Sequence, residues 1–149
     1  MRAVVQRVLE ASVTIEGRIT GKIDKGLMVL VGIKADDTPK DIEYIINKIS
    51  GLRIFGDEAG KMNLSVQDIG GKLLIVPNFT LYGNVIKGMR PSFTASGSVD
   101  EARIKYEEFI AKLAEGNIPF ETGEFQADMK VALVNDGPIT ILLDSSKNF

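Results

Sequence analysis

The chain has 149 residues, a net charge of −2 at pH 7, and no histidine or cysteine. A chain of this length is expected to form one domain over residues 1–149, and its 44% hydrophobic content is typical of a soluble globular protein. No apolar run reaches the ~18 residues that cross a bilayer, and charged side chains near the N-terminus argue against a signal peptide. We therefore expect a cytoplasmic protein without membrane contact.

The two missing residue types exclude several kinds of chemistry. Without His and Cys, the chain cannot form a Ser-His-Asp triad, a Cys-His dyad or a zinc site built on those ligands. Catalysis would have to use carboxylates, lysine, hydroxyls, backbone groups or a group of the substrate itself. The slightly negative net charge provides no general attraction for nucleic acid, so RNA would bind through a local patch.

The first third of the chain is expected to form strands. Residues 2–8 and 11–17 alternate and are rich in β-branched side chains, and a turn at 17–18 leads into the strand "ITGKI". A second turn at 24–26 precedes a buried strand over 27–33.

Two later segments have helical periodicity. The first helix is capped by Asp37 or Thr38, ends at Gly51, and places on one face Ile42, Ile45, Ile46 and Ile49. The second begins at Ser98, which forms a capping box with the residue three positions on, and ends near Glu115. Its buried stripe consists of Ala102, Tyr106, Phe109, Ile110 and Leu113.

Further strands are expected between and after the helices. Residues 73–83 form a strongly apolar strand with a kink at Pro77, and 84–93 form a loop. After residue 119, strands are expected around "FETG", over 128–134 and over 138–144. This order of elements predicts an α+β protein, a layered sandwich or partial barrel with two main helices on one side.

Two polar segments have both a structural and a functional interpretation. "PNFT" at 77–80 is either the end of an edge strand or a strand end that presents Thr80 and backbone amides to a ligand. "KGMRPSF" at 87–93 is either a solvated loop or a source of phosphate contacts from Lys87 and Arg90.

Two further segments leave the same choice open. In "TGEFQADM" at 122–129, Phe125 and Met129 are either core residues or an apolar wall on which a base stacks. "NDGPIT" at 135–140 is either a hairpin turn or a compact backbone clamp. A hairpin would place Pro138, which has no N–H, where a returning strand should donate a hydrogen bond.

Taken together, these segments resemble the D-aminoacyl-tRNA deacylases, the family of the D-Tyr-tRNA deacylases. The resemblance runs from "AVVQRV" near the N-terminus to "NDGPITILLDS" near the C-terminus. The supporting stretches are "RIFGDEAGKMNLSV", "VPNFTLYG", "KGMRPSF", "TGEFQADM" and "NDGPIT". Each is weak alone, but five in order with matching spacing are specific.

The resemblance implies a fold and an activity. Members of the family are homodimers of a three-layer β/β/α domain. They hydrolyse the ester that joins a D-amino acid, or glycine mischarged on tRNA-Ala, to the terminal adenosine of tRNA. The resemblance implies no cofactor, no metal and no DNA partner. It also implies catalysis without a protein nucleophile, in which the ribose 2′-hydroxyl assists water.

The resemblance also assigns residues to substrate selection. Gly137 and Pro138 match the family's Gly-cis-Pro motif, which enters the partner subunit's pocket and excludes L-amino acid side chains. Arg7 matches the arginine that holds this motif in place. Asn135 and Thr140 flank the motif and belong to the same substrate-binding group.

The remaining site residues match the family's pocket. Asn78, Phe79 and Thr80 match the catalytic strand, whose backbone amides stabilise the oxyanion. The residues that match the binding site for adenosine and the rest of tRNA are Phe125, Met129, Lys87 and Arg90.

Three alternatives remain open. The family usually has Ser-Gln where Pro77 and Asn78 stand, and a related animal group with Pro at this position removes L-alanine from mischarged tRNA. The chain could instead be a tRNA-binding module without catalysis. A carboxylate glycosidase or metal hydrolase would need convergence of acids such as Glu124, Asp128 and Asp136.

Overall fold

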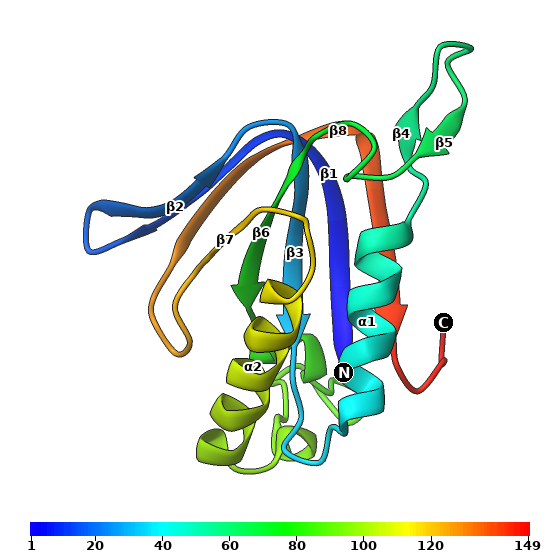
Figure 1. The fold of residues 1–149 in the computed structure, drawn as a ribbon. Helices are drawn as coiled ribbons and strands as arrows, with labels where there is room; N and C mark the ends of the chain where they lie inside the picture. The colour runs from blue at the N-terminus through cyan, green and yellow to red at the C-terminus, as the bar shows by residue number, and fades with distance from the viewer.

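In the computed structural model, which describes residues 1–149, six strands form a strongly curved sheet and two α-helices cover one of its faces (Figure 1). The strands of this sheet are β1 (Arg2–Ile15), β2 (Arg18–Ile23), β3 (Gly26–Gly32), β6 (Lys72–Pro77), β7 (Phe120–Thr122) and β8 (Lys130–Asp144). A separate hairpin consists of β4 (Phe55–Gly56) and β5 (Met62–Leu64). The helices are α1 (Pro39–Gly51) and α2 (Val99–Ala114), with short 3-10 helices η1 (Phe79–Tyr82) and η2 (Thr94–Ser96).

The long strand β1 organises the sheet. Its first half pairs antiparallel with β3 and its second half with β2, while β8 runs antiparallel along almost all of it. The strands β3, β6 and β7 lie parallel to one another. The two strands expected over 2–8 and 11–17 are therefore one continuous strand up to Ile15. Register shifts between Gln6 and Glu10 allow this strand to bend without a turn.

The curved sheet nearly closes into a barrel because β2 approaches β7. The N–H of Lys22 donates to Oε1 of Glu121 at 3.0 Å across this gap. Buried side chains form a large cluster between sheet and helices and a smaller cluster inside the bend, which includes Val13 and Met28. The predicted α+β fold with a partial barrel and two main helices is confirmed.

Both predicted helices are also confirmed. Thr38 is the N-cap of α1, because its hydroxyl accepts from the N–H of Asp41 while that carboxylate accepts from the N–H of Thr38 at 2.7 Å. Ser98 caps α2 by accepting from the N–H of Glu101, but the Glu101 side chain does not accept from the Ser98 N–H, so the predicted capping box is only half formed. The residues that the helices bury are Ile42, Ile45 and Ile49 from α1, and Ala102, Tyr106, Phe109 and Leu113 from α2.

Two strand predictions are wrong in their boundaries. The strand expected over 73–83 stops at Pro77 and continues as η1. The strands expected over 128–134 and 138–144 are one strand, β8, and both of its halves pair with β1. The segment "NDGPIT" is therefore no hairpin turn.

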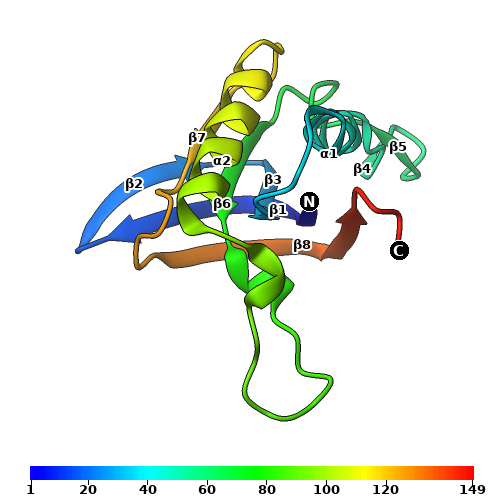
Figure 2. The same cartoon turned by 90° about the horizontal axis from the view of Figure 1, so that it is seen from below.

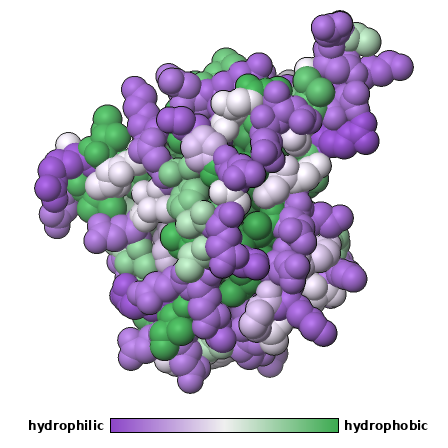
Figure 3. Space-filling model, viewed as in Figure 1, coloured by the Kyte–Doolittle hydropathy of each residue, from purple (hydrophilic) through white to green (hydrophobic).

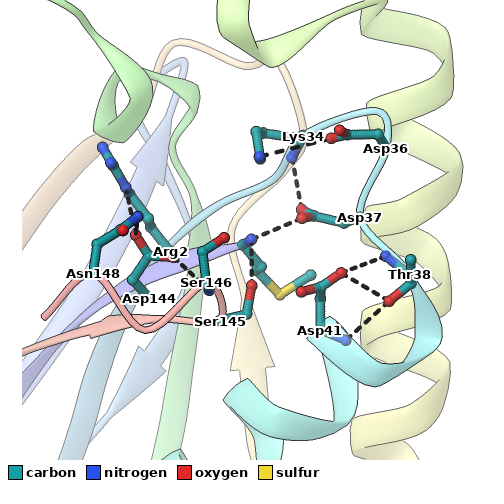
Figure 4. Close-up of polar contacts among 11 residues, drawn as sticks. Arg2, Lys34, Asp36, Asp37, Thr38, Asp41, Asp144, Ser145, Ser146 and Asn148 are labelled. Atoms are coloured by element: carbon teal, nitrogen blue, oxygen red, sulfur yellow. Dashed lines mark hydrogen bonds and ion pairs between the residues drawn. The ribbon is translucent and has the colours of Figure 1, made fainter.

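The two ends of the chain meet beside α1 (Figure 4). The N-terminal ammonium of Met1 donates to Oδ1 of Asp37 at 2.7 Å and to Oγ of Ser145 at 2.8 Å. Met1 and Asp37 are both buried. Close by, Nε of Arg2 lies 3.4 Å from Oδ2 of Asp144 at the end of β8.

The face of the sheet away from the helices is open. Figure 2 shows both helices on one side of the sheet, while the loop over 84–92 extends past the other side. Leu142 of β8 is 54% exposed. On the helix side, Figure 3 shows the β4–β5 hairpin at the upper right as mostly hydrophilic. Neither α-helix is long and apolar enough to cross a membrane.

Candidate active site

A pocket with a volume of about 650 Å³ lies where the parallel strands β3 and β6 end, and we call it the strand-end pocket. It is bounded by η1, η2, the start of α2 and the segment 125–131. Twelve of its 20 lining residues are hydrophobic. The carboxyl ends of parallel strands are a common place for ligand sites, since the chain leaves the sheet there and exposes backbone groups.

The helix η1 forms the polar wall of this pocket. Asn78 anchors it, because the N–H of Asn78 donates to the carbonyl of Val31 at 2.8 Å. Oδ1 of Asn78 accepts from the N–H of Thr80 at 3.2 Å and from the Thr80 hydroxyl. Phe79 is 58% exposed, and its ring packs edge-on against Phe93 with centroids 5.0 Å apart. The short side chain of Asn78 thus turns the strand into a 3-10 helix and presents Phe79 and Thr80 to the pocket.

Arg2 supports η1 from behind. Its Nη1 donates to the carbonyl of Leu81 at 3.0 Å, and its guanidinium lies 4.7 Å from the centroid of the Tyr82 ring. Burial, followed by the charges of Asp37 and Asp144, raises the pKa of the Tyr82 hydroxyl. The rear of η1 is therefore held by the N-terminal residues of the chain.

Phe125 forms the opposite, apolar wall. Its ring stacks on Tyr106 with centroids 5.6 Å apart, and the guanidinium of Arg103 lies 4.9 Å from the Phe125 centroid. Nη2 of Arg103 also donates to Oε1 of Gln126 at 2.7 Å. The backbone of Gln126 has a φ of 64°, a left-handed conformation that non-glycine residues seldom adopt. Arg103 and Tyr106 together fix the orientation of this wall.

The segment "NDGPIT" forms a bulge on β8. Gln6 pairs with Thr140 and Val8 with Asn135. Between these two pairs the chain advances two residues on β1 but five on β8, so the extra residues of β8 bulge out. Nδ2 of Asn135 donates to the carbonyls of Arg7 and Ile139, both at 2.9 Å, which closes the bulge.

Arg7 holds the bulge from the side. Its Nε donates to the carbonyl of Asp136 at 3.2 Å and pairs with the Asp136 carboxylate, and its Nη1 donates to the carbonyl of Ile54 at 2.7 Å. The Gly137-Pro138 peptide bond is cis, and both residues are exposed.

The predicted site residues fall into three groups in space. Those that line the strand-end pocket are Asn78, Phe79, Thr80, Phe125 and Met129. Those at the bulge are Arg7, Asn135, Gly137, Pro138 and Thr140. The third group, Lys87 and Arg90, is exposed on the loop beyond the open face.

A single chain does not bring the first two groups together. Arg7 pairs with Leu27 at the start of β3, whereas the first residue of β3 that lines the pocket is Leu30. These positions on β3 lie three residues apart, which corresponds to about 10 Å along a strand. None of the bulge residues lines the strand-end pocket.

Sequence reasoning missed Gln126, which lines the pocket, and Arg103, which contacts Gln126 and Phe125 from α2. Arg103 lies three positions before Tyr106, so it shares that side of α2 with the buried stripe, and this spacing could have indicated it. No signal in the sequence predicts the contact with Gln126, because the two residues are 23 positions apart.

Two of the three acids of the hydrolase alternative, Glu124 and Asp128, line one recess, and the third lies apart from them. Asp128 lines the strand-end pocket and pairs with Lys130 at 3.2 Å. Glu124 is exposed beside it, while Asp136 lies at the bulge against Arg7. No three acidic side chains are arranged so that they could hold a metal ion.

Comparisons with known proteins show the family of the chain. The family model described as D-Tyr-tRNA(Tyr) deacylase matches residues 4–144. The D-aminoacyl-tRNA deacylases of Koribacter versatilis and Thermotoga petrophila are 58% and 56% identical over 149 residues, and the match covers the whole of each chain.

Solved structures have the same fold. The structure titled c-Myc DNA Unwinding Element Binding Protein has a TM-score of 0.91 and 41% identity, and the match covers 97% of this chain and 98% of that one. A probable eukaryotic D-amino acid tRNA deacylase has a TM-score of 0.78 over 95% of this chain and 97% of its own, and at 16% identity it shows the fold alone. The resemblance found in the sequence is confirmed, and the chain belongs to the D-Tyr-tRNA deacylase family.

Proposed function

We propose that the protein is a D-aminoacyl-tRNA deacylase that hydrolyses the ester between a D-amino acid and the terminal adenosine of tRNA. The observation that carries this proposal is the strand-end pocket, which combines backbone amides, a hydroxyl and apolar walls. The names of the full-length relatives support it. Charged tRNA serves translation, so the cytoplasm is the proposed place of action.

The chemistry does not need a protein nucleophile. Water attacks the ester carbonyl, the bond to the ribose 3′-oxygen breaks, and that oxygen takes up a proton. The products are the free amino acid and tRNA. The ribose 2′-hydroxyl assists the attacking water in this proposal, because the hydroxyl of Thr80 donates to a neutral amide oxygen of Asn78 and has no base beside it.

The oxyanion is assigned to the backbone of η1. The amides of Asn78, Thr80 and Leu81 already have acceptors, namely the carbonyl of Val31, Oδ1 of Asn78 and the carbonyl of Asn78. We therefore assign the main donor role to the N–H of Phe79. A preorganised amide donor of this kind can provide a large part of the rate of ester hydrolysis.

The terminal adenosine is placed against the apolar wall. The Phe125 ring is held by Tyr106 and Arg103, so it offers a fixed surface on which a base can stack. Met129 lies beside Gly123, where an added Cβ would come within 2.6 Å of the Met129 sulfur. Gly123 therefore allows Met129 to pack close to the start of this segment and to line the pocket.

Chiral selection requires a second copy of the chain. Gly137 and Pro138 are exposed on the bulge and lie away from the pocket of their own chain, so they can reach a pocket only on a partner. The open face supports such pairing, because Leu142, Val4 and Leu30 lie side by side across it without a covering helix. We propose that the bulge of one subunit enters the partner's pocket, where its backbone fills the space of an L side chain and flanking Asn135 and Thr140 shape the entry.

Lys87 and Arg90 are proposed to contact tRNA phosphates. Both are exposed on the loop that extends past the open face, and neither forms an ion pair within the chain. Replacing both by alanine should weaken binding of all tRNAs equally and reduce the dependence of affinity on salt. Unchanged affinity and unchanged salt dependence would place this loop outside the RNA path.

A second candidate follows from Pro77, which lines the pocket at the position where the family usually has serine. It favours relaxed chirality and activity on L-alanine mischarged to tRNA. Glycine mischarged on tRNA-Ala is a further proposed substrate, since glycine has no side chain to exclude.

Deacylation of matched D-Tyr-tRNA and L-Tyr-tRNA tests the main proposal. We expect release of D-tyrosine and protection of L-tyrosine, with Gly-tRNA-Ala hydrolysed and L-Ala-tRNA spared. Equal rates on the D and L substrates would support relaxed chirality. If no ester is hydrolysed while tRNA still binds, the protein is a tRNA-binding module without catalysis.

A further inference from the structure

Arg103 carries a charge that nothing in the chain neutralises. Neighbouring cations are paired, Lys105 with Glu108 at 3.7 Å and Lys130 with Asp128 at 3.2 Å. Arg103 has no carboxylate within 4.0 Å, although α2 is rich in acids. Of its five N–H donors, one is engaged by the side chain of Gln126.

The guanidinium is nevertheless held in place. It lies on the Phe125 ring and donates to Gln126, so two separate contacts restrict a side chain that is usually mobile on a helix surface. An arginine held in this way loses little conformational entropy when it binds an anion.

The position of Arg103 suggests which anion it binds. A second recess of about 730 Å³, which we call the turn-side recess, lies between the β1–β2 turn and the segment 124–130. It shares residues 125–128 with the strand-end pocket. A chain of nucleotides that leaves the pocket toward this recess passes these shared residues, and Arg103 contacts two of them, Phe125 and Gln126.

The turn-side recess itself is a poor phosphate site. Its lining contains three carboxylates, Glu16, Glu124 and Asp128, against two cations, Arg18 and Lys130. Phosphate binding is therefore favoured next to Arg103 and disfavoured deeper inside the turn-side recess.

We propose that Arg103 binds the 5′-phosphate of the terminal adenosine while its stacking on Phe125 orients the adenosine. This inference rests on the proposed function, since it takes the acceptor end of tRNA as the ligand. Lysine could supply the charge but not the planar group that stacks on Phe125 and presents paired donors.

Adenosine and adenosine 5′-monophosphate provide a direct test, because they differ only in this phosphate. Their binding to the wild type, Arg103→Met and Arg103→Lys would be measured by calorimetry, beside kcat and KM for D-Tyr-tRNA. Lys105→Met is the matched control, since it removes a cation from the same helix.

We expect the wild type to bind the monophosphate more tightly than adenosine, by about tenfold, as for one charge-assisted contact. Arg103→Met should lose this advantage and raise KM for D-Tyr-tRNA. The slope of log kcat/KM against log salt concentration should become less steep by about 0.7, the value for one phosphate of a single strand. Arg103→Lys should keep part of the advantage, and Lys105→Met should keep all of it.

Three outcomes would overturn the inference. The wild type could show no preference for the monophosphate, Arg103→Met could weaken both ligands equally, or Lys105→Met could have the same effect as Arg103→Met. An equal loss on both ligands would mean that Arg103 only supports Phe125. If neither ligand binds measurably, the salt dependence of kcat/KM decides. A wild type that deacylates no tRNA would instead refute the proposed function.

Discussion

The side-chain oxygen of Asn78 accepts hydrogen bonds from both the backbone N–H and the hydroxyl of Thr80, two residues further along the chain. The Thr80 hydroxyl is therefore oriented by a neutral amide and is not activated by a base. This pair defines the polar wall of the strand-end pocket.

Thr80→Val should slow deacylation without abolishing it. The substitution removes one hydrogen bond and leaves the backbone amides of η1 in place, so we expect a loss of about tenfold in kcat. Rates on D-Tyr-tRNA measure the effect. Thr20→Val on the distant strand β2 is the control and should leave the rate unchanged. Trapping of an aminoacyl ester on Thr80 would contradict the positioning role.

Local patterns predicted the helices well but could not predict η1. The isoleucine spacing of α1 and the caps Thr38 and Ser98 act within a few residues of the chain. Both caps are confirmed, and three of the four isoleucines are buried, while Ile46 is only partly buried. By contrast, "FTLY" has the β-branched and aromatic composition of a strand. The helix forms there because Asn78 caps it and Arg2, 79 positions earlier in the chain, donates to the carbonyl of Leu81.

The bulge at "NDGPIT" illustrates the same limit. Its composition is that of a turn, and a turn would separate two strands. The structure instead keeps both halves on β1, because Arg7 and Asn135 satisfy the carbonyls that the bulge leaves unpaired. The contacts between Arg7 and the bulge span 128 and 129 positions, so no periodic pattern in the sequence indicates them. The sequence likewise contains no pattern that indicates the separation of the bulge from the pocket within one chain.

Gly137→Ala should destabilise the fold as well as affect activity. The φ of Gly137 is 131°, and a Cβ there would come within 2.7 Å of Cγ1 and 3.0 Å of the backbone nitrogen of Ile139. A strained backbone position of this kind costs roughly 1–3 kcal/mol. Thermal unfolding of the variant beside Gly88→Ala, where an added Cβ meets no atom within 4 Å, measures this cost. Equal Tm values for the two variants would mean that the bulge can adapt.

Acid should destabilise the protein through Asp144. Burial opposes ionisation of this side chain, but hydrogen bonds from the N–H of Ser146, from Asn148 and from Arg2 outweigh burial and lower its pKa. A depressed pKa contributes stability above the unfolded value of about 3.9, and this contribution is lost as the pH falls through the folded-state pKa.

The measurement is Tm as a function of pH for the wild type and Asp144→Asn. The variant should be less stable at pH 7 and should lose less stability between pH 5 and pH 2. Asp24→Asn, at an exposed turn, is the control and should follow the wild-type curve. Parallel curves for the wild type and Asp144→Asn would show that this carboxyl does not contribute to the acid response.

The buried pair of Met1 and Asp37 leads to the last prediction. The ammonium and the carboxylate are both almost completely buried, and Oδ2 of Asp37 also accepts from the N–H of Lys34 at 2.8 Å. Asp37→Asn would leave the ammonium buried without a counter-charge. The new amide group, itself a donor, would also face either the Met1 ammonium or the N–H of Lys34, which are both donors. Removing one partner of a buried ion pair costs about 3 kcal/mol or more, so we expect Tm to fall by roughly 10 °C for a chain of this size.

Asp36→Asn is the matched control for this loss. Asp36 is the neighbouring residue, its side chain is 83% exposed, and it pairs with Lys34 at 3.8 Å. An exposed pair of this kind contributes less than about 1 kcal/mol, so the control should unfold within about 3 °C of the wild type. If both variants unfold at the wild-type temperature, the ion pair at the N-terminus does not stabilise the fold. If Asp36→Asn falls as far as Asp37→Asn, the effect belongs to the whole loop before α1 and not to the contact with Met1.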